Sequence, residues 1–278
     1  MTGRGGARAA RSAAPIARWY ARHGRHDLPW RATRDRWAVL VSEVMLQQTQ
    51  VGRVAAVWDG FMARFPTPEA MAAAPAGAVI EAWGRLGYPR RARRLWEAAG
   101  RIVATGWPDD LAELPGVGRY TAEANTAQVD DLDAPAIETN IRRVVERRAG
   151  RPLSPAEAAA ASREAGHPLN GRDRLLALMD VGALLCRPRD PRCPECPLQP
   201  GCATAGVVAS AGPAAADPAL GRRPRQAAYE GSFRQRRGQV LAELRAGPRP
   251  SAELDVAALA SLLEDGLAAL DGPLARLP

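Results

Sequence analysis

The chain has 278 residues, 38 basic against 30 acidic side chains, a formal net charge of +8 and an isoelectric point near 10.2. This length can bury at least one full hydrophobic core and favours two domains. The positive balance indicates an anionic partner, and nucleic acid is the first candidate. No apolar run approaches the ~18 residues of a membrane span, so we expect a soluble protein with no membrane partner.

All of the basic residues are arginine. A GC-rich genome is the simplest cause of a chain without lysine. The chemical consequence is that no lysine side chain exists to form a Schiff base with an opened sugar.

Helices are predicted almost throughout. Residues 1–26 are rich in Arg, Ala and Ser without an acid, as in a transit peptide, but we interpret them as a short basic arm that leads into a helix near Ile16–Arg22. Apolar residues recur every three or four positions from Arg36 to Phe65, which predicts two amphipathic helices broken near Thr49.

Further helices are predicted from Thr67 to about Leu86 and from Arg90 to Thr105. No stretch alternates with a period of two until the last few residues. We therefore predict an all-α fold class.

A very tight turn follows at Leu114–Arg119. Gly116 and Gly118, with Val117 between them, allow positive φ and close approach of the backbone to a ligand, and a helix begins directly afterwards. A plain connection between helices is the alternative. In a basic chain we favour phosphate binding by the amides of this turn.

The helix after the turn is unusually polar. The segment Ala122–Asp131 is rich in polar residues. A thin apolar stripe is formed only by Tyr120, Ala124 and Ala127. Either neighbouring side chains are larger there or the packing is looser.

Four cysteines, the only ones in the chain, lie within seventeen residues with the spacing Cys-x6-Cys-x2-Cys-x5-Cys. They are Cys186, Cys193, Cys196 and Cys202. Disulfides are not favoured, because no signal peptide or small Cys-rich scaffold is present. A zinc site built from four thiolates usually has two separated Cys-x2-Cys pairs and stays an alternative. A compact run of four thiolates favours a 4Fe-4S cluster.

The loop between the first two cysteines carries Arg187, Arg189 and Arg192. A metal that clamps this loop would present its arginines to a phosphate backbone. We predict that these three arginines bind DNA.

The segment after Cys202 changes to Ala, Gly and Pro and then contains Arg222, Arg223 and Arg225, which we interpret as a linker with phosphate contacts. A truncation at Ala216 would test those contacts. The last fifty residues predict helices near Phe233–Arg245 and Val256–Asp265 and a terminal hairpin. A small winged-helix-like module and a helical cap on the main body are both open.

Together these residues resemble the helix-hairpin-helix family of base-excision DNA glycosylases, and within it the MutY-type adenine glycosylase branch. The resemblance covers roughly residues 16–202. Its motifs are Leu28–Arg31, Ser42–Val51, Leu86–Tyr88, Leu114–Gly118 and the four-cysteine pattern.

The resemblance implies a six-helix barrel that carries the hairpin and a separate iron–sulfur cluster domain. The expected division is 1–35 for an N-terminal arm and helix of the cluster domain, 36–138 for the barrel, 139–205 for the cluster domain, 206–228 for a linker and 229–278 for the C-terminal module.

The family hydrolyses the N-glycosidic bond of a flipped-out adenine mispaired with 8-oxoguanine or guanine. A base inside a duplex must be extruded, and a side chain must fill the gap that it leaves. The resemblance implies that Gln48 fills this gap. It also implies an adenine pocket lined by Trp30, Arg31, Leu46 and Asp180, although many relatives carry Glu at the last position.

Adenine leaves readily only when it is protonated as the bond breaks, which requires a general acid. Glu43 matches the acid of the family, and it lies in an apolar helix where desolvation favours its protonated form. A solvated helix residue is the alternative outside this motif.

The second carboxylate departs from the family. Relatives have Asp where this chain has Glu138, while Asn140 keeps its place. In the family, this carboxylate stabilises or captures the oxocarbenium ion. The reference pKa values of Asp and Glu differ by only about 0.4 unit. One extra methylene, however, moves the carboxylate by about 1 Å, and such a shift can cost roughly a hundredfold in rate.

Tyr120 occupies the position at which the related endonuclease III branch has its Schiff-base lysine. A tyrosine cannot form that adduct, so we expect a monofunctional enzyme that leaves the abasic strand uncut.

Two other functions stay open. A thymine-mispair glycosylase shares several motifs, although Gln47–Gln50 favours the adenine branch. A DNA-binding paralogue with weak or no turnover is the other, because of Glu138. We expect a monomer that binds mispaired double-stranded DNA in the bacterial cytoplasm, associated with the nucleoid.

Overall fold

The structure is a computed structural model that describes residues 14–206 and 228–278. The start of the expected basic arm, most of the expected linker, and with it Arg222, Arg223 and Arg225, lie outside the described residues. Contacts divide the chain into two compact units. Of the described residues, 14–34 and 119–206 make up the first, and 35–118 and 228–278 make up the second.

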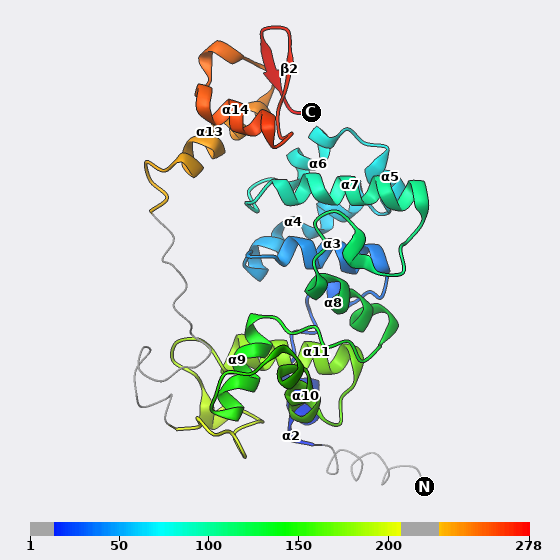
Figure 1. Cartoon of the computed structure of the whole chain (residues 1–278), viewed down its shortest axis with the longest axis vertical. Helices are drawn as coiled ribbons and strands as arrows, with labels where there is room; N and C mark the ends of the chain where they lie inside the picture. The colour runs from blue at the N-terminus through cyan, green and yellow to red at the C-terminus, as the bar shows by residue number, and fades with distance from the viewer. Residues whose placement is uncertain (1–13, 207–227) are drawn as a thin grey trace. The chain divides into compact units, whose positions relative to one another are not determined.

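The first unit is helical (Figure 1). Its helices are α2 (Pro15–His23), α8 (Arg119–Asp130), α9 (Thr139–Ala149), α10 (Pro155–Gly166) and α11 (Gly171–Asp180), with short helical turns at Pro29–Arg31, Val181–Leu185 and Cys193–Glu195. The α2, α8, α9 and α10 helices all contact α11, so α11 is the centre of this unit. Ile141, Leu176 and Leu178 belong to its buried core.

Side-chain caps and glycines set several ends of these helices. Ser154 and Glu157 form a reciprocal capping box at the start of α10. The α9 helix ends at Gly150, which has a φ of 71° in the left-handed region that favours glycine.

The α8 helix buries polar side chains as well as alanines. Ala124 and Ala127 are buried as expected, but Tyr120 is only half-buried. Thr121, Asn125 and Gln128 are buried beside the alanines. The expectation of a thin apolar stripe was therefore incomplete, because hydrogen-bonding side chains complete the buried face of this helix. The buried guanidinium of Arg172 also reaches this helix, where it binds the backbone carbonyl of Gln128 at 2.7 Å.

The second unit combines a helical part with the C-terminal module. Its elements are α3 (Arg36–Leu46), α4 (Val51–Arg64), α5 (Pro68–Ala72), α6 (Ala76–Trp83), α7 (Arg90–Thr105), the turn Leu111–Glu113, α13 (Phe233–Ala246), β1 (Arg249–Pro250), the turn Ser251–Glu253, α14 (Val256–Glu264), β2 (Ala269–Asp271) and β3 (Leu274–Arg276). The α7 helix contacts α3, α5 and α6. Large side chains such as Trp37, Phe61 and Trp83 fill the core.

The single helix expected from Thr67 to Leu86 is wrong. The structure has two shorter helices there, α5 and α6, separated by Ala73–Pro75. Pro75 precedes the first residue of α6 as its N-cap, and it cannot continue α5 because its nitrogen carries no hydrogen. Both short helices pack on α7.

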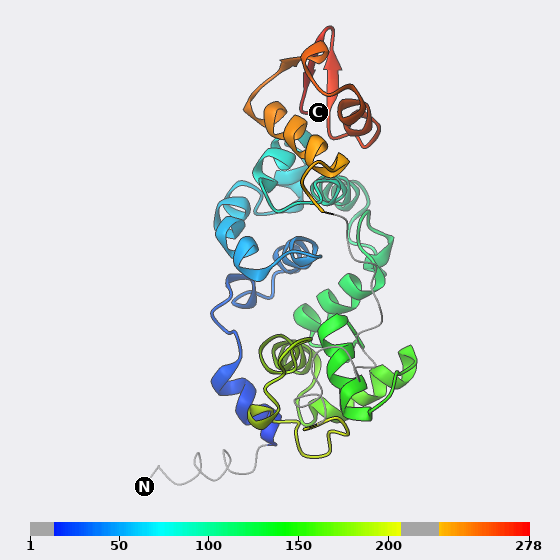
Figure 2. The same cartoon turned by 90° about the vertical axis from the view of Figure 1, so that its left-hand side faces the viewer.

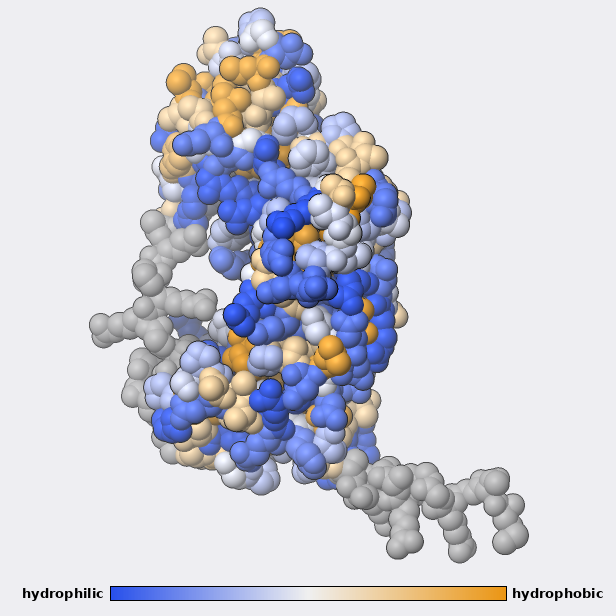
Figure 3. All heavy atoms as spheres, turned by 45° about the vertical axis from the view of Figure 1, so that its right-hand side comes forward, coloured by the Kyte–Doolittle hydropathy of each residue, from blue (hydrophilic) through white to orange (hydrophobic). Residues whose placement is uncertain are grey.

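The C-terminal module has the two expected helices and a small antiparallel sheet in the order β1-β3-β2. The terminal hairpin is β2 and β3, and β1 was not anticipated because it is only two residues long. Figure 2 shows the strands beside α13 and α14. Exposed apolar residues at Val256, Leu270 and Leu274 belong to this module, where Figure 3 shows orange side chains.

The module is attached to α6 and α7 of its own unit. Asp265 forms ion pairs with Arg90 of α7 and with Arg237 of α13. Gly77 donates its amide to the carbonyl of Pro278 at 2.6 Å. A Cβ at position 77 would meet Pro278 and Leu277. The module is therefore docked on its own unit, and its two helices with a small antiparallel sheet suit the winged-helix-like alternative.

The mostly helical fold class is confirmed, with one small sheet. In the two described ranges, no helix has both the length and the apolar character that crossing a bilayer demands.

Candidate functional site

The four cysteines come together in the first unit. Cys186, Cys193, Cys196 and Cys202 line one small cavity together with Arg147 and Leu185. All four thiols are free and partly buried. Burial raises the pKa of the Cys186 thiol, and it raises that of Cys196 to about 11. A metal that binds here must therefore displace protons from buried thiols.

The four cysteine side chains line the same cavity. Among the residues described, no three His, Cys, Asp or Glu side chains lie close enough to bind one ion together. A tetrahedral zinc ion needs four sulfurs at about 2.3 Å from one centre. A cubane cluster has a different iron for each thiolate, so its sulfurs lie farther apart. Four cysteine thiols around one cavity are a donor set that a 4Fe-4S cluster can use.

Arg147 of α9 holds the cysteine loop. The residue is 2% exposed, and its guanidinium donates to the Cys186 sulfur at 3.4 Å and to the backbone carbonyl of Arg187 at 2.8 Å. The carbonyl of Arg147 accepts from the hydroxyl of Thr204 at 3.0 Å and from the Cys202 thiol. One residue of α9 therefore contacts both ends of the cysteine segment.

The three arginines of the cysteine loop differ in their exposure and in their ion pairs. Arg187 is tied to Asp190 by a contact of 2.6 Å. Arg189 and Arg192 are exposed, and the guanidinium of Arg192 lies 3.9 Å from Glu195. Arg189 and Arg192 are thus better placed to meet an anion than Arg187 is.

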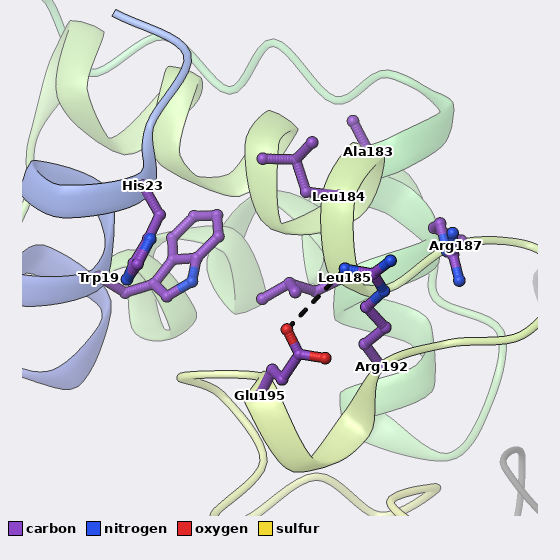
Figure 4. Close-up of a pocket in the computed structure, with 8 residues that line it drawn as sticks. All are labelled: Trp19, His23, Ala183, Leu184, Leu185, Arg187, Arg192 and Glu195. Atoms are coloured by element: carbon purple, nitrogen blue, oxygen red, sulfur yellow. Dashed lines mark ion pairs between the residues drawn. The ribbon is translucent and has the colours of Figure 1, made fainter.

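A cavity of about 570 Å³ lies beside this loop (Figure 4). Trp19 and His23 of α2 line one side, and Arg192 and Glu195 line another. Leu185 and Arg192 line both this cavity and the cysteine cavity.

The glycine turn has the predicted positive φ at Gly116 but not at Gly118. Gly116 has a φ of 77°, and a Cβ there would meet the side chain of Arg94 at 2.8 Å. Gly118 has open space where its Cβ would be. The Val117 side chain is buried, so the turn offers its backbone rather than this side chain.

Glu138 and Asn140 come together at the start of α9. Glu138 is the N-cap of this helix, and its Oε1 accepts from the amide of Ile141 at 2.9 Å. Its Oε2 accepts from Nδ2 of Asn140 at 3.0 Å. Burial raises the pKa of Glu138 above its ordinary value, although these hydrogen bonds and the charge of Arg143 act in the opposite direction.

The same network continues to the cysteine loop. Nη2 of Arg143 donates to Oδ1 of Asn140 and to the carbonyl of Gly182, each at 2.7 Å. Nε of Arg143 donates to the carbonyl of Cys186 at 2.6 Å. Sequence reasoning missed Arg143 and Arg147, although their spacing of four along α9 places both on one helical face.

Tyr120 is the second residue of α8. Its side chain is partly buried, and its hydroxyl lies 3.9 Å from the sulfur of Met179. It belongs to the same unit as Glu138.

Arg31 and Asp180 form a buried bidentate ion pair. Nη1 of Arg31 lies 2.7 Å from Oδ2 of Asp180, and Nη2 lies 2.9 Å from Oδ1. Arg25 contacts both carboxylate oxygens as well. Burial alone would raise the pKa of Asp180, but the hydrogen bonds and charges of these arginines hold it below its ordinary value. Trp30, which directly precedes Arg31 in the sequence, is buried.

The remaining predicted residues lie on the second unit. Glu43 is 5% exposed on α3, so the expected desolvation of its carboxyl is present. Leu46 is the last residue of α3 and is partly buried. Gln48 is exposed in the following loop and has a φ of 55°.

Known proteins are similar to this chain in sequence and in fold. Residues 41–165 match the HhH-GPD superfamily of base excision DNA repair proteins. The chain is 43% identical over 277 residues to an adenine DNA glycosylase of Mycobacterium tuberculosis strain H37Rv, with 90% of this chain and 87% of the relative covered. A thermostable thymine-DNA glycosylase is similar in structure, with a TM-score of 0.62, 27% identity and coverage of 69% of this chain and 94% of that one.

An endonuclease III solved in a non-covalent complex with DNA has a TM-score of 0.59 and 22% identity. It covers 69% of this chain and 92% of its own, and it supports the shared fold. The matching superfamily defines a base-excision repair enzyme of the helix-hairpin-helix class. The chain belongs to the adenine DNA glycosylase family. It is a DNA N-glycosylase, and DNA is its partner.

Proposed function

We propose that this enzyme hydrolyses the N-glycosidic bond of adenine opposite 8-oxoguanine or guanine and leaves the strand uncut. The observation that carries this proposal is the carboxylate of Glu138, held at the N-terminus of α9 by Ile141 and Asn140. A fixed carboxylate can stabilise positive charge on the sugar as the bond breaks.

Glu43 supplies the proton in this proposal. Its side chain is buried, which suits a carboxyl that donates a proton to a base in a closed pocket. The role of Glu138 is electrostatic or nucleophilic, and Asn140 orients it. Tyr120 carries no amine, and the chain contains no lysine, so no lysine Schiff base with the sugar can form.

The adenine pocket is proposed to include Trp30, Arg31, Leu46 and Asp180. The ion pair between Arg31 and Asp180 fixes both side chains, which favours recognition of one base edge over many. The carboxylate of Asp180 accepts hydrogen bonds from Arg31 and Arg25. In this proposal Asp180 therefore positions Arg31 in the pocket.

The four cysteines are proposed to hold a 4Fe-4S cluster. When bound, the cluster supplies a rigid anchor for the segment between Cys186 and Cys202. The exposed Arg189 and Arg192 then join the amides of Gly116–Gly118 as phosphate contacts. We also propose that the enzyme acts as a monomer in the bacterial cytoplasm, on chromosomal DNA.

A single-turnover assay tests the reaction. Duplexes with adenine opposite 8-oxoguanine, adenine opposite guanine and thymine opposite guanine are compared, with Glu43→Gln as the control for chemistry. We expect adenine release from the first two, no thymine release, and strand breaks only after alkali. Preferential release of thymine would favour the thymine-mispair activity that the structural similarity to a thymine-DNA glycosylase suggests.

The absence of strand cleavage has its own test. Borohydride traps a Schiff base between enzyme and sugar as a covalent adduct. No adduct is expected from this chain, and an adduct in good yield would contradict the proposal. Release of neither base by the native chain, with release by Glu138→Asp, would instead identify a DNA-binding paralogue with little turnover.

A further inference from the structure

Arg91 of α7 is a buried cation that contacts two separate loops. It is 9% exposed. Nη1 donates to the backbone carbonyls of Val44 at 2.8 Å, Met45 at 3.0 Å and Gln47 at 2.6 Å. Nη2 donates to the hydroxyl of Thr49 at 2.9 Å and to the carbonyl of Gly87 at 3.0 Å. The guanidinium therefore joins the end of α3 to the turn before α7.

Both loops contain a residue in a backbone conformation that is rare without glycine. Gln48 has a φ of 55°, and Tyr88 has a φ of 47°. Such conformations persist only where the surroundings impose them. Arg91 binds the residues on both sides of Gln48 and the residue directly before Tyr88.

The side chains of Gln48 and Tyr88 are both exposed. Tyr88 is 48% exposed. Further contacts connect the loops. The hydroxyl of Thr49 lies 3.4 Å from the carbonyl of Leu86, and Arg53 donates to the carbonyl of Arg85 at 2.6 Å. The rings of Trp83 and Tyr88 lie 5.2 Å and 5.5 Å from the Arg91 guanidinium.

We propose that Arg91 is a positioning residue for base extrusion, which locks the Gln47–Thr49 loop to the Gly87–Tyr88 turn and so keeps Gln48 projecting as a rigid wedge. The proposal rests on the proposed function and on the role that the family resemblance implies for Gln48, which is to fill the gap that the extruded base leaves. A wedge that is rigid before binding loses little conformational entropy when it enters the stack.

The contact set requires arginine rather than any cation. The hydrogen bonds diverge from one planar guanidinium to oxygens on two loops, whereas a lysine offers three donors from a single nitrogen. Burial lowers the pKa of Arg91 to about 10, so the group stays charged near neutral pH. Its charge also lies at the C-terminal end of α3, where a helix favours a cation.

Stopped-flow fluorescence tests the proposal on the full-length holoenzyme. 2-Aminopurine beside the target adenine reports extrusion, and the duplex carries adenine opposite 8-oxoguanine. We expect Arg91→Lys to slow extrusion by about tenfold or more. The matched control is Arg90→Lys, which alters the neighbouring arginine that pairs with Asp265 and should leave extrusion unchanged.

A double-mutant cycle with Gln48→Ala separates positioning from general support of α3. If Arg91 acts through Gln48, the doubly substituted enzyme extrudes the base no more slowly than Gln48→Ala alone. Additive losses, or an unchanged extrusion rate in Arg91→Lys with slower base release, would overturn the proposal. Should Arg91→Lys not fold, Thr49→Val removes one of the five contacts and is expected to act in the same direction.

The proposed function can fail separately. If the native enzyme releases no adenine from any duplex, the proposed reaction is wrong, while the 2-aminopurine signal still measures extrusion and still decides the role of Arg91.

Discussion

Arg143 donates from Nε to the backbone carbonyl of Cys186 at 2.6 Å, so one guanidinium contacts both the first cysteine and the Asn140 that binds Glu138. Arg143 is 3% exposed, and burial strengthens each of these charge-assisted bonds. The position of the Glu138 carboxylate therefore depends on the segment that holds the cysteines.

Replacing Arg143 with lysine is expected to lower the single-turnover rate by about ten- to a hundredfold, because a lysine cannot bind Asn140, Gly182 and Cys186 together. Iron content measured on the same preparation should fall as well. Arg142→Lys is the matched control, since the neighbouring Arg142 is paired with Glu146 and is more exposed. A normal rate in Arg143→Lys would contradict the coupling.

The pH dependence of the reaction should report Glu138. Burial raises the folded-state pKa of Glu138. As pH falls, Glu138 therefore becomes protonated at a higher pH than an exposed glutamate does. We expect the acidic limb of the single-turnover rate to be shifted upward accordingly. Glu138→Gln should lower the rate by about a hundredfold or more and abolish that limb.

The same shift has a consequence for stability. A group with a raised folded-state pKa contributes stability that is complete below the unfolded-state pKa and is lost as pH rises through the folded-state pKa. The melting temperature of the native chain should therefore decline relative to that of Glu138→Gln over this interval. A constant difference between the two would contradict the raised pKa.

Asp180→Asn should destabilise the protein by about 3 kcal/mol at neutral pH, because it leaves Arg31 buried without its counter-charge. Urea denaturation measures this loss. The folded-state pKa of Asp180 is lowered, so its contribution is complete above the unfolded-state pKa and is lost as pH falls through the folded-state pKa. The difference between the two chains should shrink in acid. Glu81→Gln, at the exposed ion pair with Arg64, is the control and should cost far less.

Substitution of any one cysteine by serine tests the metal. We expect Cys193→Ser to lose iron and inorganic sulfide and to bind DNA more weakly, while the second unit keeps its helices. Elemental analysis of the native protein distinguishes the two metals that the spacing allows. Four iron atoms per chain would confirm the cluster, and one zinc atom would contradict it.

Local patterns predicted the fold well. Periodicity and proline positions gave α7 with the bounds that the structure has, and the cysteines meet because they lie close together in sequence. The break at Pro75 was missed because apolar residues continue across it and the periodicity is not interrupted. The polar face of α8 also follows a helical period, but its burial depends on partners elsewhere in the first unit.

The site was less predictable where charges pair over long separations. Arg31 and Asp180 are 149 residues apart, and a chain with 38 arginines offers each carboxylate many candidate partners. Arg91 and Arg143 gave no signal as single residues. Their roles arise from carbonyl groups, which every residue has and which no sequence pattern marks.

The attachment of the C-terminal module changes what a deletion experiment can report. A chain ended at Ala216 would leave Arg90 without Asp265 and would uncover the Gly77 amide and the Ile80 carbonyl that binds Arg245. Weaker DNA binding by that shortened chain would then reflect an altered α6–α7 surface as much as lost phosphate contacts. The module is better dissected by single substitutions on its outer face in the full chain.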